Sequence, residues 1–271
     1  MSIPKIIHYC WFGGNPLPNY AVKYIETWKK YFPDYKIIEW NENNYDVHKI
    51  PYTSEAYNAK KYAFVSDYAR FDVLYEFGGI YFDVDVEVIK PFGEILNDTG
   101  FMGTESRGII AAGLGMGCNA GLEVVNEILE HYRNDHFLSD SGINLKTVVL
   151  RITEILTEKG FDTKKKGLQK IAGFTIYPPQ YFAPQNPQTL VTKIVPKTVS
   201  MHHYWLGDEK NSVSWITDAH KRELLFRNKF FGFWGDNVFS SLLFRVIIKF
   251  RLKEFVAKIL IDCDKKDVEI R

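Results

Sequence analysis

Two aspartates separated by one residue, Asp83 and Asp85, end an apolar run that begins after Gly78 and Gly79. Side chains alternate along a strand, so both carboxylates are expected on one side while Val84 faces a core. Two hard oxygen ligands on one face suit Mg²⁺ or Mn²⁺. The pattern therefore predicts a divalent-metal site, and the alternative is a pair of solvated carboxylates at a strand end.

A second pair of charged residues precedes the glycines. Asp67 and Arg70 are three residues apart, which places them on one face of a helix. The helix is expected to bring them to the region of Asp83 and Asp85, where a metal ion and a guanidinium together would bind a diphosphate. The alternative is a surface ion pair, which contributes little to stability.

The Asp-x-Asp spacing occurs once more, at Asp262 and Asp264. This copy lies in a tail rich in lysine and aspartate and is not preceded by a helix that ends in a Gly-Gly pair. Short motifs of this kind recur by chance in a chain of this length, so we interpret the second copy as noise.

Two adjacent histidines, His202 and His203, could complete the metal site, because imidazole binds metal ions alongside carboxylates. Neighbouring strand residues face opposite sides, so only one of the two is expected to enter the site. The alternative is that both histidines are packing or surface residues.

These residues belong to a chain in which strands and helices alternate. The alternation favours a mostly parallel sheet with helices on both faces, which binds ligands beyond the carboxyl ends of its strands. Residues 11–14 and 83–85 would both lie there, in one crevice. The patterns predict strands at 5–11, 35–40, 80–89, 174–177 and 198–203, and helices at 17–31, 56–77, 122–132 and 144–159.

Residues 108–121 contain five glycines. Their spacing matches neither a P-loop nor a dinucleotide-binding turn, so we predict a close-packed loop lining the acceptor side of the crevice.

The composition is typical of a globular protein, and the net charge is small. The 271 residues are 46% hydrophobic, enough for a full core, and 15% aromatic, which suits stacking on sugars or bases. A net charge of +1 argues against nucleic acid as a partner. Three separated cysteines indicate neither a disulfide framework nor a zinc ribbon. We expect no signal peptide and no membrane-spanning segment.

The C-terminal stretch differs in character. Residues 220–260 contain nine lysines and arginines against three acids. Arg245, Lys249 and Lys253 recur every four residues opposite an apolar stripe, which predicts an amphipathic helix. We divide the chain into a main domain, residues 1–226, and a basic, aromatic helical appendage, residues 227–271. Residues 227–260 are a candidate membrane-surface helix, and the alternative is a helix packed on the main domain.

Three segments together resemble glycosyltransferase family 32, the group with an Asp-x-Asp sugar-binding region that includes capsule and lipopolysaccharide transferases. They are residues 3–14, residues 66–85 and the His202–His203 pair. The resemblance implies a GT-A type nucleotide-sugar-binding fold. It is close over residues 3–92 and patchy beyond them. After the histidines the family usually has Gly-Ser-Trp, whereas this chain has Gly207-Asp208-Glu209, so one of these carboxylates would replace the family's ligand.

The resemblance also implies roles for individual residues. Trp11 would stack on the nucleotide base and Cys10 would contact it through the backbone. Asp67 and Arg70 would hold the donor sugar, and Asp83 would contact the ribose and sugar. Asp85 would bind Mn²⁺ or Mg²⁺ with His202 or His203, and Asp83, Asp85 and Arg70 would form the catalytic set.

The function expected on this basis is metal-dependent, retaining transfer of a hexose from a nucleotide sugar to a surface polysaccharide or a lipid-linked glycan. UDP-hexose is the favoured donor and GDP-mannose the alternative. The enzyme would be cytoplasmic, at the inner face of the membrane. Modification of a protein hydroxyl is a second hypothesis, and a non-catalytic sugar- or nucleotide-binding protein is a third.

Overall fold

The computed structural model describes residues 3–105, 108–139, 142–144, 146–185 and 192–203. All of these residues belong to one compact unit. The boundary expected at residue 226, the amphipathic helix, the carboxylates after the histidines and the second Asp-x-Asp copy lie outside the described residues. Within those ranges, no helix is both long enough and apolar enough to cross a membrane.

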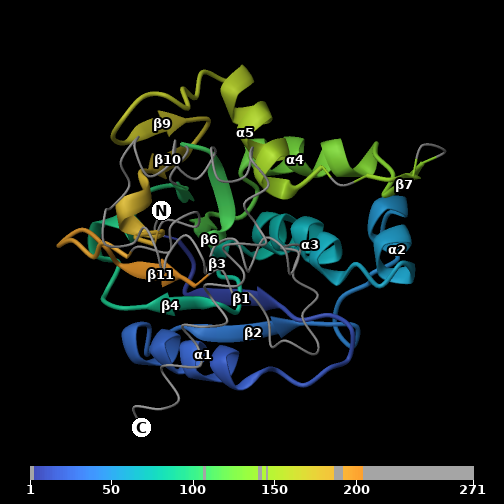
Figure 1. Cartoon of the computed structure of the whole chain (residues 1–271), viewed down its shortest axis with the longest axis horizontal. Helices are drawn as coiled ribbons and strands as arrows, with labels where there is room; N and C mark the ends of the chain where they lie inside the picture. The colour runs from blue at the N-terminus through green and yellow to red at the C-terminus, as the bar shows by residue number, and fades with distance from the viewer. Residues whose placement is uncertain (1–2, 106–107, 140–141, 145, 186–191, 204–271) are drawn as a thin grey trace, which may run out of the picture. The chain divides into compact units, whose positions relative to one another are not determined.

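A seven-stranded sheet forms the centre, in the order β2-β1-β3-β6-β5-β10-β9 (Figure 1). Strands β1, β2, β3, β5 and β10 run in one direction, whereas β6 and β9 run in the other. The predicted α/β architecture with a mostly parallel sheet is confirmed. The strand bounds are Ile6–Cys10 (β1), Lys36–Trp40 (β2), Gly79–Tyr81 (β3), Gly100–Thr104 (β5), Ile110–Cys118 (β6), Gln169–Ile171 (β9) and Phe174–Tyr177 (β10).

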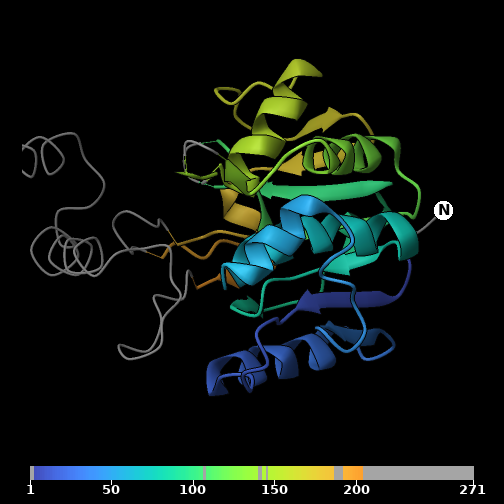
Figure 2. The same ribbon diagram turned by 90° about the vertical axis from the view of Figure 1, so that its right-hand side faces the viewer.

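Helices cover both faces of this sheet, as Figures 1 and 2 show. One hydrophobic core joins α2 through α5 to one face, and the second joins α1 to the other through Trp28, which is fully buried. The sheet therefore separates two cores. The helices are Asn19–Tyr31 (α1), Pro51–Asn58 (α2), Tyr62–Phe77 (α3), Glu123–Arg133 (α4) and Val148–Glu158 (α5), with 3₁₀ turns at Gly93–Asn97 and Pro179–Tyr181.

Two short ribbons complete the fold. Strand β4, Val86–Val88, pairs antiparallel with β11, Ser200–His202. The indole N–H of Trp28 on α1 donates to the Val86 carbonyl at 2.8 Å, which fastens this ribbon to α1. The second ribbon pairs β7, Leu138–Ser139, with β8, Gly142–Ile143.

The single strand predicted for residues 80–89 is wrong, because β3 and β4 are separate strands. Between them the N–H of Asp83 donates to the Gly113 carbonyl, and the N–H of Val86 donates to the Asp83 carbonyl at 3.0 Å, which closes a turn. Val84 and Asp85 lie in that turn. The two aspartates therefore come together through a turn and not through strand alternation.

The helix predicted for residues 56–77 is also two elements. Helix α2 ends in a Schellman motif, in which Lys60 N–H donates to Tyr57 O and Lys61 N–H donates to Ala56 O, both at 2.8 Å. Lys60 has a φ of 57°. This left-handed residue stops α2 and lets α3 start in a new direction.

The loop predicted for residues 108–121 is wrong, because residues 110–118 form β6 in the middle of the sheet. Its glycines let aromatic rings pack against the backbone: a Cβ at Gly115 would lie 2.8 Å from the Phe82 ring, and one at Gly117 would lie 2.6 Å from the Phe101 ring. The pairing of β5 with β6 also shifts register after Met102, and residues 112–115 form the irregular part of β6.

Candidate active site

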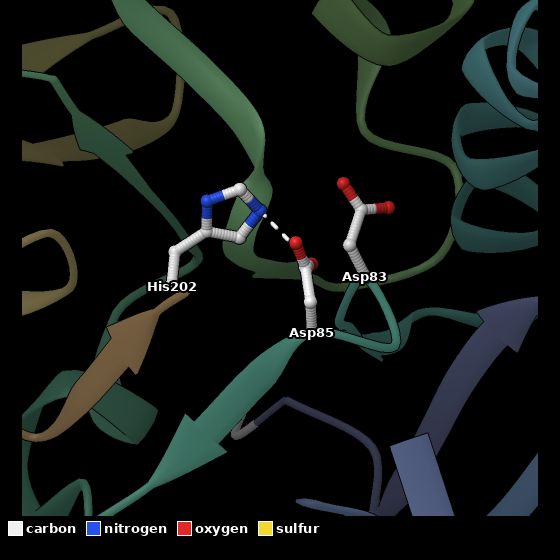
Figure 3. Close-up of side chains that lie close together, drawn as sticks. All are labelled: Asp83, Asp85 and His202. Carbon is white, nitrogen blue, oxygen red and sulfur yellow. Dashed lines mark ion pairs between the residues drawn. The ribbon is translucent and has the colours of Figure 1, made fainter. Parts of the chain in front are cut away.

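Asp83, Asp85 and His202 gather at the end of the β4–β11 ribbon (Figure 3). One ligand atom from each lies within 4.8 Å of the other two. His202 Nε2 is 3.0 Å from Asp85 Oδ1, and both side chains are more than four-fifths buried. Burial acts to lower the pKa of His202, but the Asp85 carboxylate raises it above its usual value. Two carboxylates and one imidazole thus share one small, largely buried space.

An arginine links this group to α3. Arg70 Nη2 lies 2.9 Å from Asp67 Oδ1 and 3.5 Å from Asp83 Oδ1, and the Arg70 Nε donates to the Ser66 carbonyl at 3.0 Å. The Arg70 side chain is 6% exposed, so its position is tightly fixed. The predicted proximity of the helix pair to the acidic pair is therefore present in the structure.

Asp67 is an unusual carboxyl group because it is buried next to other charges. Burial raises the pKa of Asp67 to about 6, whereas Arg70 and a hydrogen bond from the Val148 N–H act to lower it. Val148 is the first residue of α5. Asp67 thus meets the start of a helix more than 80 residues away in the sequence.

Tyr81 is a neighbour of the site that the sequence reasoning missed. Its hydroxyl donates to Asp83 Oδ1 at 3.0 Å, and its ring lies 5.0 Å from the Arg70 guanidinium. Burial raises the pKa of Tyr81 well above its usual value, so the phenol keeps its proton and donates. Its place two residues before Asp83, in the run that the sequence predicts as a single strand, is the signal that could have indicated it.

Gly113 in the irregular part of β6 makes room for Asp83. It accepts the Asp83 N–H, and a Cβ on it would lie 1.9 Å from Asp83 Oδ2. Strand irregularities of this kind commonly re-aim chains next to functional sites. The glycine-rich segment therefore contributes to the site as a strand and not as a loop.

The two histidines diverge, as strand alternation predicts for neighbours. His203 Nε2 lies 2.8 Å from Glu87 Oε2, and its ring stacks on Tyr24 of α1 with 4.5 Å between ring centroids. Its backbone N–H donates to the Asp85 carbonyl at 3.0 Å. His203 is therefore outside the group that His202 forms with the two aspartates.

Cys10 and Trp11 lie at the carboxyl end of β1. Cys10 is buried, and this burial raises the pKa of its thiol to about 12. Trp11 is half-buried, its indole N–H donates to the Asn15 carbonyl at 2.7 Å, and its backbone N–H donates to the Trp40 carbonyl. The Arg70 charge acts on Cys10, so the end of β1 adjoins the Asp67–Arg70 pair.

Comparison with known proteins identifies the region that holds most of these residues. Residues 18–102 match the family described as "Glycosyltransferase sugar-binding region containing DXD motif". This segment is therefore similar to a glycosyltransferase sugar-binding region. It contains Asp67, Arg70, Asp83 and Asp85, and the resemblance predicted from the sequence is confirmed over this part of the chain.

The chain is also similar to curated proteins over part of its length. Inositol phosphoceramide mannosyltransferase 1 of Schizosaccharomyces pombe is 28% identical over 112 residues, which cover 37% of this chain and 34% of that protein. Inositol phosphoceramide mannosyltransferase 3 of the same organism is 30% identical over 104 residues, 35% of this chain and 28% of that protein. The matching part thus spans about a third of these relatives. A solved structure titled "PaToxG Glycosyltransferase" aligns with a TM-score of 0.46 at 17% identity, covering 59% of this chain and 70% of that one.

Proposed function

We propose that this protein is a metal-dependent glycosyltransferase that moves a hexose from a nucleotide sugar to a lipid-linked or surface-polysaccharide acceptor. The observation that carries the proposal is the convergence of Asp83, Asp85 and His202 beside Arg70, within and next to the sugar-binding region. Such a site places positive charge where a nucleoside diphosphate leaving group would develop negative charge.

The donor set fits a divalent cation. Carboxylate oxygens suit Mg²⁺ and Mn²⁺, and imidazole favours the softer Mn²⁺ of the two. Asp85 and His202 would hold the ion, with Asp83 next to it. When bound, the ion supplies Lewis-acid stabilisation of the diphosphate oxygens.

The chain's own residues would orient the donor. Arg70 is buried and held by Asp67, Asp83 and Ser66, so its guanidinium is pre-organised to bind an anionic or hydroxyl oxygen without reorganisation. Asp67 and Asp83 would accept hydrogen bonds from sugar and ribose hydroxyls. Trp11 and the Cys10 backbone would hold the base, as the family resemblance implies, and retention at the anomeric carbon has the same basis.

The names of the curated relatives bear on both the acceptor and the donor sugar. The names of the curated relatives specify mannose transfer to an inositol phosphoceramide, a membrane lipid. They favour a lipid-linked acceptor at the membrane surface and make GDP-mannose the second candidate beside UDP-hexose. Transfer to a protein hydroxyl and non-catalytic sugar or nucleotide binding are the remaining alternatives.

The test is a panel of nucleotide sugars incubated with the full chain and either Mn²⁺ or EDTA, with release of UDP or GDP as the readout. We expect release from one donor, lost with EDTA and reduced about 100-fold or more in Asp85→Ala. The matched control is Asp34→Ala, which removes an exposed carboxylate paired with Lys5 and should release the diphosphate like the wild type. Donor binding without any release, unaffected by EDTA, would support the binding-protein alternative.

A further inference from the structure

Arg151 is a buried arginine that the proposed function does not yet use. Its side chain is 6% exposed and projects from α5. The guanidinium lies 5.3 Å from the ring centroid of Tyr52 on α2 and 4.7 Å from that of Tyr132 on α4. Three helices therefore meet at this one cation, whose contacts with both rings are favourable.

The same guanidinium fastens the chain that leads into α5. Arg151 Nη2 lies 2.5 Å from Asp135 Oδ2, and the Arg151 Nε donates to the Lys146 carbonyl at 3.3 Å. Asp135 also accepts from the Asn144 side-chain amide at 3.0 Å. The two ends of the segment between α4 and α5 are thus tied to each other and to Arg151.

The segment between α4 and α5 leads directly to Val148, the first residue of α5 and a neighbour of Asp67. Thr147 caps α5, its hydroxyl accepting from Leu150 N–H, and the next N–H, that of Val148, is close enough to the Asp67 carboxylate to lower its pKa. The place where α5 begins therefore decides whether Asp67 has this second donor. Arg151 lies one turn into the same helix, and its charge also acts on Asp67.

We propose that Arg151 is a positioning residue for Asp67: it fixes the start of α5 so that the Val148 N–H and the helix N-terminus face the donor-site carboxylate. The inference deepens the proposed function and rests on it for the effect on turnover. Without Arg151, Asp135 loses its buried ionic partner and the first turn of α5 is released from α2 and α4. Asp67 then turns toward Arg70 alone, and donor binding weakens.

A double-mutant cycle tests this coupling. We expect Arg151→Gln to raise the KM for the nucleotide sugar about tenfold with a smaller change in kcat, and to have less than about a twofold effect when Asp67 is already asparagine. A purely structural role would lower the amount of folded enzyme equally in both backgrounds. Equal losses in the two backgrounds, or a folded Arg151→Gln enzyme with wild-type KM, would overturn the inference.

A second variant keeps the test decisive if Arg151→Gln does not fold. Asp135→Asn removes the partner of Arg151 from a carboxylate that is 31% exposed, and it should raise the same KM. The matched control is Arg133→Gln on α4, whose guanidinium pairs with exposed Glu130 and should leave the KM unchanged.

A readout independent of turnover separates this inference from the proposed function. Asp67 is faced by Arg70 on its own helix, Asp83 after β3 and Arg151 on α5, and it acts on the phenols of Tyr52 and Tyr132. Carboxyl NMR of the full chain should show Asp67 titrating at higher pH in Arg151→Gln and Asp135→Asn than in the wild type and Arg133→Gln. An unchanged Asp67 titration would contradict the positioning role. An absence of UDP or GDP release by the wild type would contradict only the proposed function.

Discussion

At the scale of single residues, Gly113 decides where the Asp83 carboxylate can lie. A Cβ there would lie 1.9 Å from Asp83 Oδ2, so an alanine must push the carboxylate away from Arg70. We predict that Gly113→Ala lowers donor turnover about 100-fold, since a displacement of about 1 Å in a reacting site costs that much. Nucleoside diphosphate release at saturating donor measures the effect.

Gly117 on the same strand provides the control for this substitution. Its Cβ would lie 2.6 Å from the Phe101 ring, in the core and away from the carboxylates. Gly117→Ala should lower the melting temperature yet leave turnover per folded molecule unchanged. Wild-type turnover in Gly113→Ala would show that the Asp83 position has no bearing on the reaction.

The buried carboxyl of Asp67 predicts an acid limit for activity. Burial raises its pKa to about 6, so lowering the pH through 6 protonates it and removes its ion pair with Arg70. Above pH 6 the pair is intact. We expect kcat/KM for the donor to fall as the pH drops below about 6, and this limb to be absent from the residual activity of Asp67→Asn. A pH profile with the same acid limb in both proteins would contradict the assignment.

Residue types and spacing predicted most of the grouping of side chains but not all of it. The helix pair and the acidic pair could be associated from local sequence because a Gly-Gly stop joins their elements. The choice between His202 and His203 could not be predicted from local sequence. It depends on the register of β11, in which His202 lies opposite Val86. Arg151 and Val148 gave no local signal, because their relation to Asp67 exists only after α5 has packed.

At the scale of elements, His8 on β1 holds the turn that precedes the acidic pair. It is fully buried, its Nδ1 accepts from the Trp40 indole, and its Nε2 therefore donates to the Gly78 carbonyl at 2.8 Å. Burial lowers the pKa of His8 to about 4. A neutral imidazole thus links β1 and β2 to the start of β3.

This histidine makes the stability of the fold depend on pH. The folded pKa lies below the unfolded value of 6.5, so the stabilisation is complete above pH 6.5 and is lost as the pH falls toward 4. We predict that His8 contributes a loss of about 2 kcal/mol in unfolding free energy between pH 8 and pH 5. Urea unfolding at the two pH values measures this loss. In His8→Gln the unfolding free energy should fall by about 2 kcal/mol less between pH 8 and pH 5 than in the wild type. An equal pH dependence in both proteins would show that His8 is not responsible.

Element types were predictable where periodicity was strong, as for α1, β1, β2 and β10. The break between β3 and β4 was not, because the turn at Val84 and Asp85 contains no glycine, proline or asparagine and is imposed by the Gly113 carbonyl. The strand β6 could not be predicted because its glycines are typical of a loop. They are there because aromatic rings pack against the β6 backbone, and these rings come from other segments of the chain.

At the scale of the whole molecule, the charge is nearly balanced but unevenly distributed. The net charge is +1, whereas residues 220–260 have nine basic residues against three acids. We predict that the full chain floats with vesicles containing anionic lipid, and that Arg245, Lys249 and Lys253 changed together to glutamine reduce the bound fraction more than about tenfold, at about 1 kcal/mol per basic residue.

A matched triple substitution controls for charge alone. Lys164, Lys165 and Lys166 form an exposed run in the described domain, and their change to glutamine removes the same charge elsewhere. This variant should float like the wild type. Equal flotation of all three proteins would end the membrane-surface hypothesis.

The pairing of β4 with β11 joins strands more than 110 residues apart in the sequence. A ribosome that has synthesised the acidic pair must therefore make most of the remaining domain before the imidazole of His202 is available. Until then β4 lacks β11, the strand with which it pairs in the described part of the chain, and an exposed strand edge is prone to pair with other chains. Completion of the proposed cation site thus coincides with pairing of that edge, so that a nascent or prematurely terminated chain would expose the acids without the histidine.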